Sequence, residues 1–269
     1  MDANISIGQW VESLASKGRH SFSLNEVRNT FANDTEAAMK LKLTRLAGKG
    51  KIISIHKGYY LIITPQYASR GVLPPSLFID GLMKFLKRRY YVSLLNAAAF
   101  HGAAHQQPQE YFVVTNFPVL RPTGKKGIKI NYISKKEIPE PYLEKRKTET
   151  GFINISNPAL TAIDLVQFDK RVGGLDRVAT VLNELTEAIK PEQITESFLQ
   201  TMPVTAIQRL GFLLDVILKQ DIGKHLYEVS QKAGLDFFRI PLKTAAAKKG
   251  FPADERWKVI VNTEIEIDG

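Results

Sequence analysis

The first 65 residues contain an ordered series of helix and strand signals, and this order restricts the fold more than any other feature of the chain. Apolar residues recur at helical spacing over residues 5–14, and Lys17-Gly18 follows as a helix end. Ser23 and Glu26 then form a capping box, in which Ser caps the helix and Glu lies three residues on. Two short helices are therefore expected before residue 32.

A third helix and a hairpin are expected to follow. Thr35 is a second helix cap, and the helix that it opens runs to about Ala47, before Gly48-Lys49-Gly50. Two β-rich runs, 52–55 and 59–63, flank a short connection that contains Gly58. Three helices and a hairpin in this order predict a winged helix-turn-helix over residues 1–65. A helical bundle with a basic face is the simpler alternative.

The third helix has one apolar face and one polar face. At 100° per residue, Met39, Leu43 and Leu46 share the inward face. The outward set mixes cations, a hydroxyl and apolar groups, which can contact phosphates, guanine edges and thymine methyls. It consists of Ala37, Lys40, Leu41, Thr44 and Arg45. The expected DNA-binding residues, with the turn of the hairpin included, are Thr35, Lys40, Thr44, Arg45, His56 and Lys57.

The net charge of the chain favours a polyanionic partner. Lys and Arg number 37 against 27 Asp and Glu, which gives a formal net charge of +10. The excess lies in the first 150 residues, whereas residues 151–269 carry slightly more acidic than basic side chains. Because cations displace condensed counterions from phosphates, an anion-binding surface is expected in the N-terminal half.

The remaining residues, 66–269, are expected to form a larger α/β domain, so the fold class of the chain is α+β. A small mixed sheet flanked by helices is predicted from strands at 111–115, 128–133 and 257–265. The expected helices are 77–89 with Ser76 as its cap, 91–103, one opened by Asn157-Pro158, 174–189, 192–200, 203–219 and 222–233.

Cations of the middle of the chain define a candidate second basic surface. Four of them gather at one helix end, and four more occupy a loop and the next strand. They either add phosphate contacts or complement the helix dipole and solvate a loop, and the sequence favours neither. The residues are Lys84, Lys87, Arg88, Arg89, Arg121, Lys125, Lys126 and Lys129.

The sequence argues against an enzyme and predicts no catalytic residue, metal or cofactor. Cysteine is absent, and the glycines of residues 124–127 lack the spacing of a phosphate-binding loop. His101 and His105 share helical spacing, but no Glu stands where a metal site needs one. Asp164 is expected to be a partly buried structural carboxylate, since Glu110 is the only nearby candidate for a nuclease-like partner.

The N-terminus has neither the basic region nor the apolar run of a signal peptide, and no apolar run approaches the roughly 20 residues that span a bilayer. A cytoplasmic protein with no membrane contact is therefore expected.

Several segments resemble, in order along the chain, the AbiEi family of bacterial antitoxins. They read LTRLAGKGKIISIHKGYYLI near the N-terminus, then YYVSLLNAAAFHGAAHQQPQEYFVV at 90–114 and SNPALTAIDLV at 156–166. The segment around His101-Gly102 is the most specific, and residues 190–269 hold no strong match. The resemblance implies an N-terminal winged helix followed by an antitoxin domain over residues 66–269.

The same resemblance implies an antitoxin of type IV toxin–antitoxin (abortive infection) systems. Such a protein represses its own operon by binding inverted-repeat, double-stranded promoter DNA, and it neutralises a nucleotidyltransferase-like toxin without a need for a stable complex. A monomer that cooperates only on DNA is compatible with this function. The alternative is a one-component transcriptional regulator whose C-terminal domain senses a ligand in an enclosed apolar pocket.

Overall fold

The protein is described by a computed structural model over residues 5–68, 73–103, 108–247 and 249–267. His105 lies outside the described residues. The chain divides into two compact units. The first unit contains Met1–Tyr91, Gln109–Ile138 and Lys145–Asn154, and the second contains Val92–Pro108, Pro139–Glu144 and Ile155–Gly269. Residues 1–65 thus share a unit with later segments, and a domain boundary at residue 65 stays a prediction.

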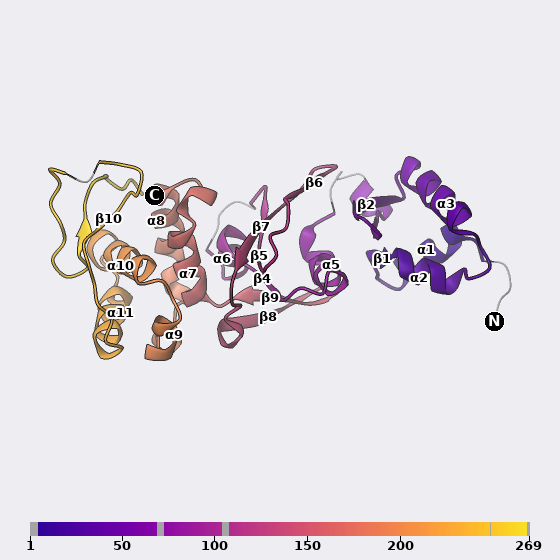
Figure 1. The fold of residues 1–269 in the computed structure, drawn as a ribbon. Coiled ribbons are helices and arrows are strands. Elements are labelled where there is room, and N and C mark those ends of the chain that lie inside the picture. Colours follow the sequence, from indigo (N-terminus) through magenta and orange to yellow (C-terminus); the bar gives the residue numbers. More distant parts are fainter. Residues whose placement is uncertain (1–4, 69–72, 104–107, 248, 268–269) are drawn as a thin grey trace. The chain divides into compact units, whose positions relative to one another are not determined.

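The N-terminal part of the first unit combines three helices with a small antiparallel sheet (Figure 1). The sheet has the strand order β1-β3-β2. The elements follow one another as α1 (Ile7–Ser16), β1 (Ser21–Ser23), α2 (Leu24–Thr30), α3 (Glu36–Gly48), β2 (Ile52–His56) and β3 (Tyr59–Ile62). The three helices and the hairpin lie where the sequence predicts them. Strand β1 carries no local signal, because its three residues become a strand only by pairing with β3.

Local capping explains where these helices begin. The Ser23 hydroxyl accepts the Glu26 N–H at 3.2 Å, and the Glu26 carboxylate accepts the Ser23 N–H at 2.7 Å, as the capping box predicts. Thr35 caps α3 by accepting the Ala38 N–H at 3.2 Å. The turn between β2 and β3 contains Gly58 at φ +77°, a conformation that glycine adopts without steric cost.

These elements enclose a hydrophobic core of their own. All members of the core lie between residues 7 and 62, and each is at least nine-tenths buried. The Trp10 ring packs edge-on against Phe22 and Phe31, which ties α1 to β1 and α2. The buried members are Ile7, Val11, Leu14, Phe22, Val27, Met39, Leu43, Ile52 and Ile62.

A six-stranded mixed sheet follows, with the strand order β6-β7-β5-β4-β9-β8. Strand β5 is buried along almost its whole length, and it pairs parallel with β7, as is usual for strands covered on both faces. The edge strand β8 is mostly exposed and charged, which opposes edge-to-edge pairing. The strands are β4 (Tyr90–Val92), β5 (Tyr111–Asn116), β6 (Thr123–Lys125), β7 (Ile128–Lys135), β8 (Leu143–Thr148) and β9 (Gly151–Ser156).

Three short helical segments precede or accompany this sheet in the first unit: α4 (Pro65–Ala68), a 3₁₀ turn at Pro75–Leu77 and α5 (Ile79–Phe85). The prediction of Ser76 as a helix cap is wrong, because α5 begins after Phe78 without a side-chain cap. The predicted helix over 91–103 is also wrong at its start. Tyr90–Val92 form β4, because their apolar side chains are buried within the sheet, and α6 covers only Leu94–Phe100.

The second unit is mainly helical. Helix α7 is buried over Pro158–Val166 and contacts α6, α8 and α10, so it forms the centre of this unit. Asn157 caps α7 by accepting the Leu160 N–H at 2.8 Å, as predicted. The other helices are α8 (Leu175–Leu185), α9 (Glu196–Gln200), α10 (Val204–Phe212) with a π-helical turn at Leu213–Ile217, and α11 (Asp221–Lys232).

The C-terminal segment packs against α10 through Trp257, which is fully buried. The Gln208 amide donates to the backbone carbonyls of Phe238 and Trp257, both at 2.8 Å. The long strand predicted over 257–265 is wrong, since only Val259–Ile260 form a strand, β11, which pairs with β10 (Ile240–Pro241). The class prediction of an α+β chain with a mixed sheet is confirmed. No helix among the described residues is long and apolar enough to cross a membrane.

Candidate nucleic-acid interface

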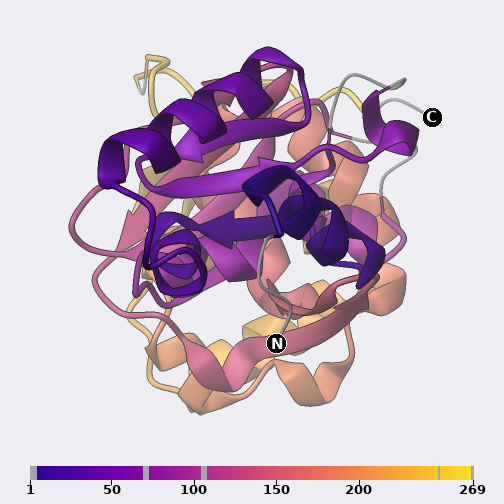
Figure 2. The same cartoon turned by 90° about the vertical axis from the view of Figure 1, so that its right-hand side faces the viewer.

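Helix α3 presents an exposed face that is basic and partly apolar. Figure 2 looks onto the three N-terminal helices, with α3 crossing the top of the view. Met39 and Leu43 are buried, and Leu46 is half-buried, so the inward face lies where the helical spacing predicts it. The predicted outward side chains are all exposed: Ala37, Lys40, Leu41, Thr44 and Arg45. Leu41 is 52% exposed, although leucine is usually buried.

A cluster of three charged side chains joins the start of α3 to α2. The Arg28 guanidinium donates from Nε and Nη2 to the two carboxylate oxygens of Glu36, at 2.9 and 2.7 Å. The Lys40 ammonium lies 3.2 Å from the same carboxylate. Hydrogen bonds from Arg28 and then from Lys40 lower the pKa of Glu36 from 4.5 to about 2. The Glu36 carboxylate is therefore ionised at neutral pH.

Arg45 and Thr44 differ in whether another group of the protein binds their side chains. The Thr44 hydroxyl donates to the Lys40 carbonyl at 2.9 Å, so it is engaged with its own helix. Arg45 lines a shallow groove of about 190 Å³ together with Lys42, Lys49 and the start of α1 at Ser6–Gly8. Within the described residues, no hydrogen bond or ion pair engages the Arg45 guanidinium. Its charge is consequently available to an external anion.

The turn of the β2–β3 hairpin carries the other two predicted contacts. His56 and Lys57 are exposed, and the His56 Nδ1 lies 3.2 Å from the Lys57 carbonyl. The His56 ring also lies 6.1 Å from the Phe85 ring of α5, in an edge-on arrangement. Lys57 thus projects from a turn whose other side packs on α5. A DNA-binding role of the predicted residues on α3 and on this turn stays a prediction.

The cations around the end of α5 are only partly available. Lys84 pairs with Asp80 at 2.6 Å, one helical turn away. Arg88 donates from Nη1 to the Asn116 carbonyl at 3.1 Å, and the backbone N–H of Arg89 donates to the Asn116 side chain at 3.2 Å. Lys87, at φ +54°, ends the helix as an exposed side chain. Arg88 and Arg89 therefore help to fix the loop after β5.

The β6–β7 hairpin reaches the N-terminal elements through one side chain. Lys125 donates from Nζ to the Ser54 carbonyl of β2 at 2.6 Å. Lys126 occupies the tip at φ +44°, and Lys129 lies 3.9 Å from Glu110. Arg121 and these three lysines are all exposed. The structure thus brings part of the candidate second basic surface next to β2, and its role on DNA stays a prediction.

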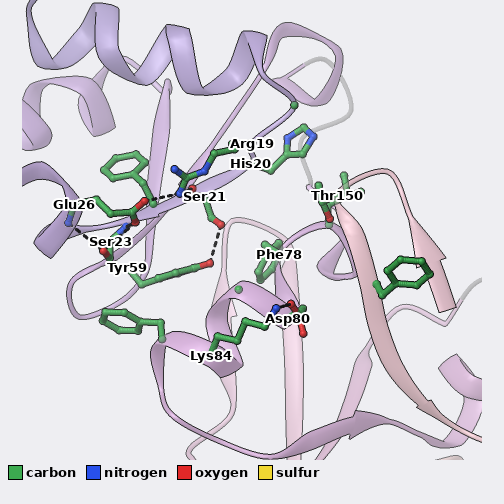
Figure 3. A pocket seen from close by; sticks show the side chains of 16 residues that line it. Arg19, His20, Ser21, Ser23, Glu26, Tyr59, Phe78, Asp80, Lys84 and Thr150 are labelled. Carbon is green, nitrogen blue, oxygen red and sulfur yellow. Dashed lines mark hydrogen bonds and ion pairs between the residues drawn. The ribbon is translucent and has the colours of Figure 1, made fainter. Parts of the chain in front are cut away.

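A polar pocket of about 450 Å³ lies in the first unit (Figure 3). Two ion pairs line it, Arg19 with Glu26 at 2.6 Å and Lys84 with Asp80 at 2.6 Å. Phe152 lines it from β9 and is 57% exposed, so the pocket is open to solvent. It differs in this respect from the enclosed apolar pocket that a ligand-sensing regulator would need.

Tyr59 of β3 lines this pocket (Figure 3). Its hydroxyl lies 2.7 Å from the Ser21 hydroxyl, and burial raises the pKa of Tyr59 to about 12. A side chain at Gly81 of α5 would overlap the Tyr59 hydroxyl, so the absence of a Cβ at Gly81 permits this close approach. Tyr59 is consequently a tightly packed, uncharged part of the pocket lining.

The residues weighed for catalysis have structural partners. Asp164 is fully buried, rather than partly buried as expected, and it accepts the Ser93 hydroxyl at 2.7 Å. His101 lies 2.8 Å from the Ser156 carbonyl through Nε2. Glu110 accepts the Asn131 amide at 2.6 Å. Within the described part of the chain, no group of three His, Asp or Glu side chains could hold a metal ion.

Sequence reasoning missed the interaction of Arg28 with Glu36. Both residues are visible as charges, one near the end of the second predicted helix and one at the start of the third. Their pairing depends on how the turn at residues 31–35 orients the two helices, and no local pattern gives that angle. The spacing of eight residues across a predicted turn was the one available signal.

Comparison with known proteins places this architecture among solved folds. The crystal structure of the RV2827C protein from Mycobacterium tuberculosis aligns with a TM-score of 0.65 over 96% of this chain and 92% of that chain, at 16% sequence identity. At this identity the similarity concerns the fold alone. A comparison with curated protein sequences gives no match.

The family comparison identifies the class of protein. Residues 91–216 match the family described as the AbiEi antitoxin C-terminal domain, so the chain carries the domain of a bacterial antitoxin. This match supports an AbiEi-type antitoxin, as the resemblance implies. This family is not a family of enzymes.

Proposed function

We propose that the protein is a cytoplasmic antitoxin that represses its own operon through residues 1–65 and neutralises a cognate nucleotidyltransferase-like toxin through residues 66–269. The observation that carries the DNA-binding half is the exposed, basic face of α3, followed by a hairpin with Lys57 at its turn. The order α1-β1-α2-α3-β2-β3 supports a winged helix-turn-helix, in which α3 would be the helix that enters the major groove.

The surroundings of each residue indicate which part of the DNA it is proposed to contact. Arg45, which has no internal partner among the described residues, is suited to a phosphate oxygen in the groove beside the start of α1. Leu41 and Ala37, exposed on the same helix, are suited to thymine methyl groups. Lys57 would add a phosphate or minor-groove contact from the turn. The lysines of the β6–β7 hairpin would extend the phosphate contacts, because Lys125 joins that hairpin to β2.

A binding assay with promoter DNA tests the repressor half. The full chain should shift a fragment that carries an inverted repeat from upstream of its own gene, as a monomer for each half-site. The double variant Lys40→Ala, Arg45→Ala should lose about two phosphate contacts, and the slope of log K against log salt should fall by roughly 1.8. The matched control is Lys224→Ala, Arg239→Ala, which removes two exposed cations from the second unit.

A co-expression assay tests the antitoxin half. The family match over residues 91–216 supports a cognate toxin as functional partner, whether or not the two proteins touch. The full chain, produced together with the toxin encoded beside it, should restore growth. The variant Lys40→Ala, Arg45→Ala should restore growth equally, because neutralisation is proposed to reside outside residues 1–65. If the wild-type chain does not restore growth, the antitoxin half of the proposal is contradicted.

A further inference from the structure

Helix α3 begins with an acidic side chain, whereas its other charged side chains are basic. Glu36 is the first residue of α3, and its side chain is 43% exposed. A carboxylate next to DNA is repelled by phosphates, so its presence there weakens nonspecific binding. A residue at this place must either be kept away from DNA or meet a group on the DNA that donates a hydrogen bond.

Arg28 holds the Glu36 carboxylate in a fixed orientation but does not bury it. Arg28 uses two donors of its planar guanidinium on the two oxygens of Glu36, and its third donor, Nη1, holds Asn25 at 2.9 Å. Such a bidentate pair sets the plane of the carboxylate as well as its position. The carboxylate remains accessible to solvent in this fixed orientation.

The charge of the cluster permits a close approach to DNA. Arg28 and Lys40 together outweigh the single negative charge of Glu36, so the cluster as a whole is cationic. Because the carboxylate is ionised at neutral pH, it can only accept hydrogen bonds. In the major groove, the amino group of cytosine is the donor that Glu and Asp side chains characteristically recognise.

We propose that Glu36, oriented by Arg28, determines specificity by accepting a hydrogen bond from the amino group of one cytosine in each half-site of the operator. This inference rests on the proposed function, because the first residues of a recognition helix are those that reach base edges in the major groove. Arg28 is a positioning residue in this arrangement. Lys40 is free to leave the carboxylate for a phosphate when the helix enters the groove.

The test is a binding profile of the full chain over single base-pair substitutions of the promoter fragment. The wild-type chain should lose affinity roughly fivefold or more when one particular C·G pair of each half-site is replaced. Glu36→Ala, which removes both acceptor oxygens, should lose this preference and keep the profile at every other position. Arg28→Lys, which retains the charge but not the two-pronged contact, should weaken the same preference.

The control is Glu12→Ala. Glu12 is an exposed carboxylate of α1 that pairs with Lys51 at 2.6 Å, so this change removes the same charge from the same group of helices. It should leave the profile unchanged. Circular dichroism of each variant establishes that the fold is intact.

Two outcomes would overturn the inference and leave the proposed function in place. In the first, Glu36→Ala tightens binding to every sequence by the same factor, which would mean that the carboxylate only screens cations. In the second, Glu36→Ala keeps the wild-type profile. A wild-type chain that binds no better to the promoter fragment than to unrelated DNA would instead overturn the proposed function, and this inference with it.

Discussion

Gly211 of α10 offers a sharp test of how the C-terminal segment packs. A Cβ at this position would overlap the ring carbons of Trp257, far inside the 3.4 Å at which ordinary contacts begin. Trp257 is fully buried, and its ring stacks on Phe237 at 5.6 Å and meets Tyr227 edge-on at 5.4 Å. The ring therefore has no free space into which it could move.

The expected cost of Gly211→Ala follows from two opposing effects. Forcing extra volume into a packed core costs about 1–3 kcal/mol, whereas replacing glycine by alanine in a helix gains about 0.5–1 kcal/mol. The net loss in the free energy of unfolding should be about 1–2 kcal/mol. With a urea dependence of about 2 kcal/mol per molar, the midpoint should fall by about 0.5–1 M.

Gly48 provides the matched control for this measurement. It is the last residue of α3, and a Cβ there would meet nothing within 4 Å. Gly48→Ala should therefore leave the urea midpoint unchanged or raise it slightly. Circular dichroism and the fluorescence of the two tryptophans would follow unfolding. A Gly211→Ala variant as stable as wild type would refute the described packing of Trp257 on α10.

Three further predictions concern titration and capping. The Glu36 carboxyl should titrate with a pKa of about 2 by carbon NMR, and Arg28→Met should raise this pKa toward 4.5; an unshifted wild-type pKa would contradict the ion cluster. Burial lowers the pKa of His20 below 6.5. The stability that neutral His20 contributes is therefore complete above pH 6.5, and it declines as the pH falls through the lowered pKa. His20→Gln should accordingly flatten the loss of urea stability between pH 7 and 5, and an unchanged slope would count against this cause. Asn157→Ala should lower the free energy of unfolding by about 1 kcal/mol, because α7 loses its cap, and Asn25→Ala, on an exposed helix surface, should not.

Local signals in the sequence were sufficient for the three N-terminal helices and for the β2–β3 hairpin. The capping box of Ser23, the cap at Thr35 and the glycine after α3 act between residues three or four positions apart, so their effect can be read without knowledge of the tertiary fold. The same reasoning located α7 from Asn157-Pro158. The outward face of α3 followed from helical spacing alone.

Elements that depend on distant partners could not be predicted in this way. Val92 of β4 pairs with Ile155 of β9, more than sixty residues away, and the apolar run around it is equally compatible with a helix. Trp257 was expected in a strand, but its burial against α10 determines the path of the chain there. The contact of Arg28 with Glu36 also depends on the angle between two helices.

The most direct test of the account is the affinity of the full chain for its own promoter, measured by fluorescence anisotropy over a series of salt concentrations. The account predicts that a fragment with the inverted repeat binds at least a thousandfold more tightly than a scrambled fragment at physiological salt, with an affinity that falls steeply as salt rises. It also predicts that Lys40→Ala, Arg45→Ala weakens binding to both fragments by a similar factor and lowers the salt dependence, because these two residues are proposed to contact phosphates. Equal affinity for the two fragments would contradict the claim that α3 reads operator DNA.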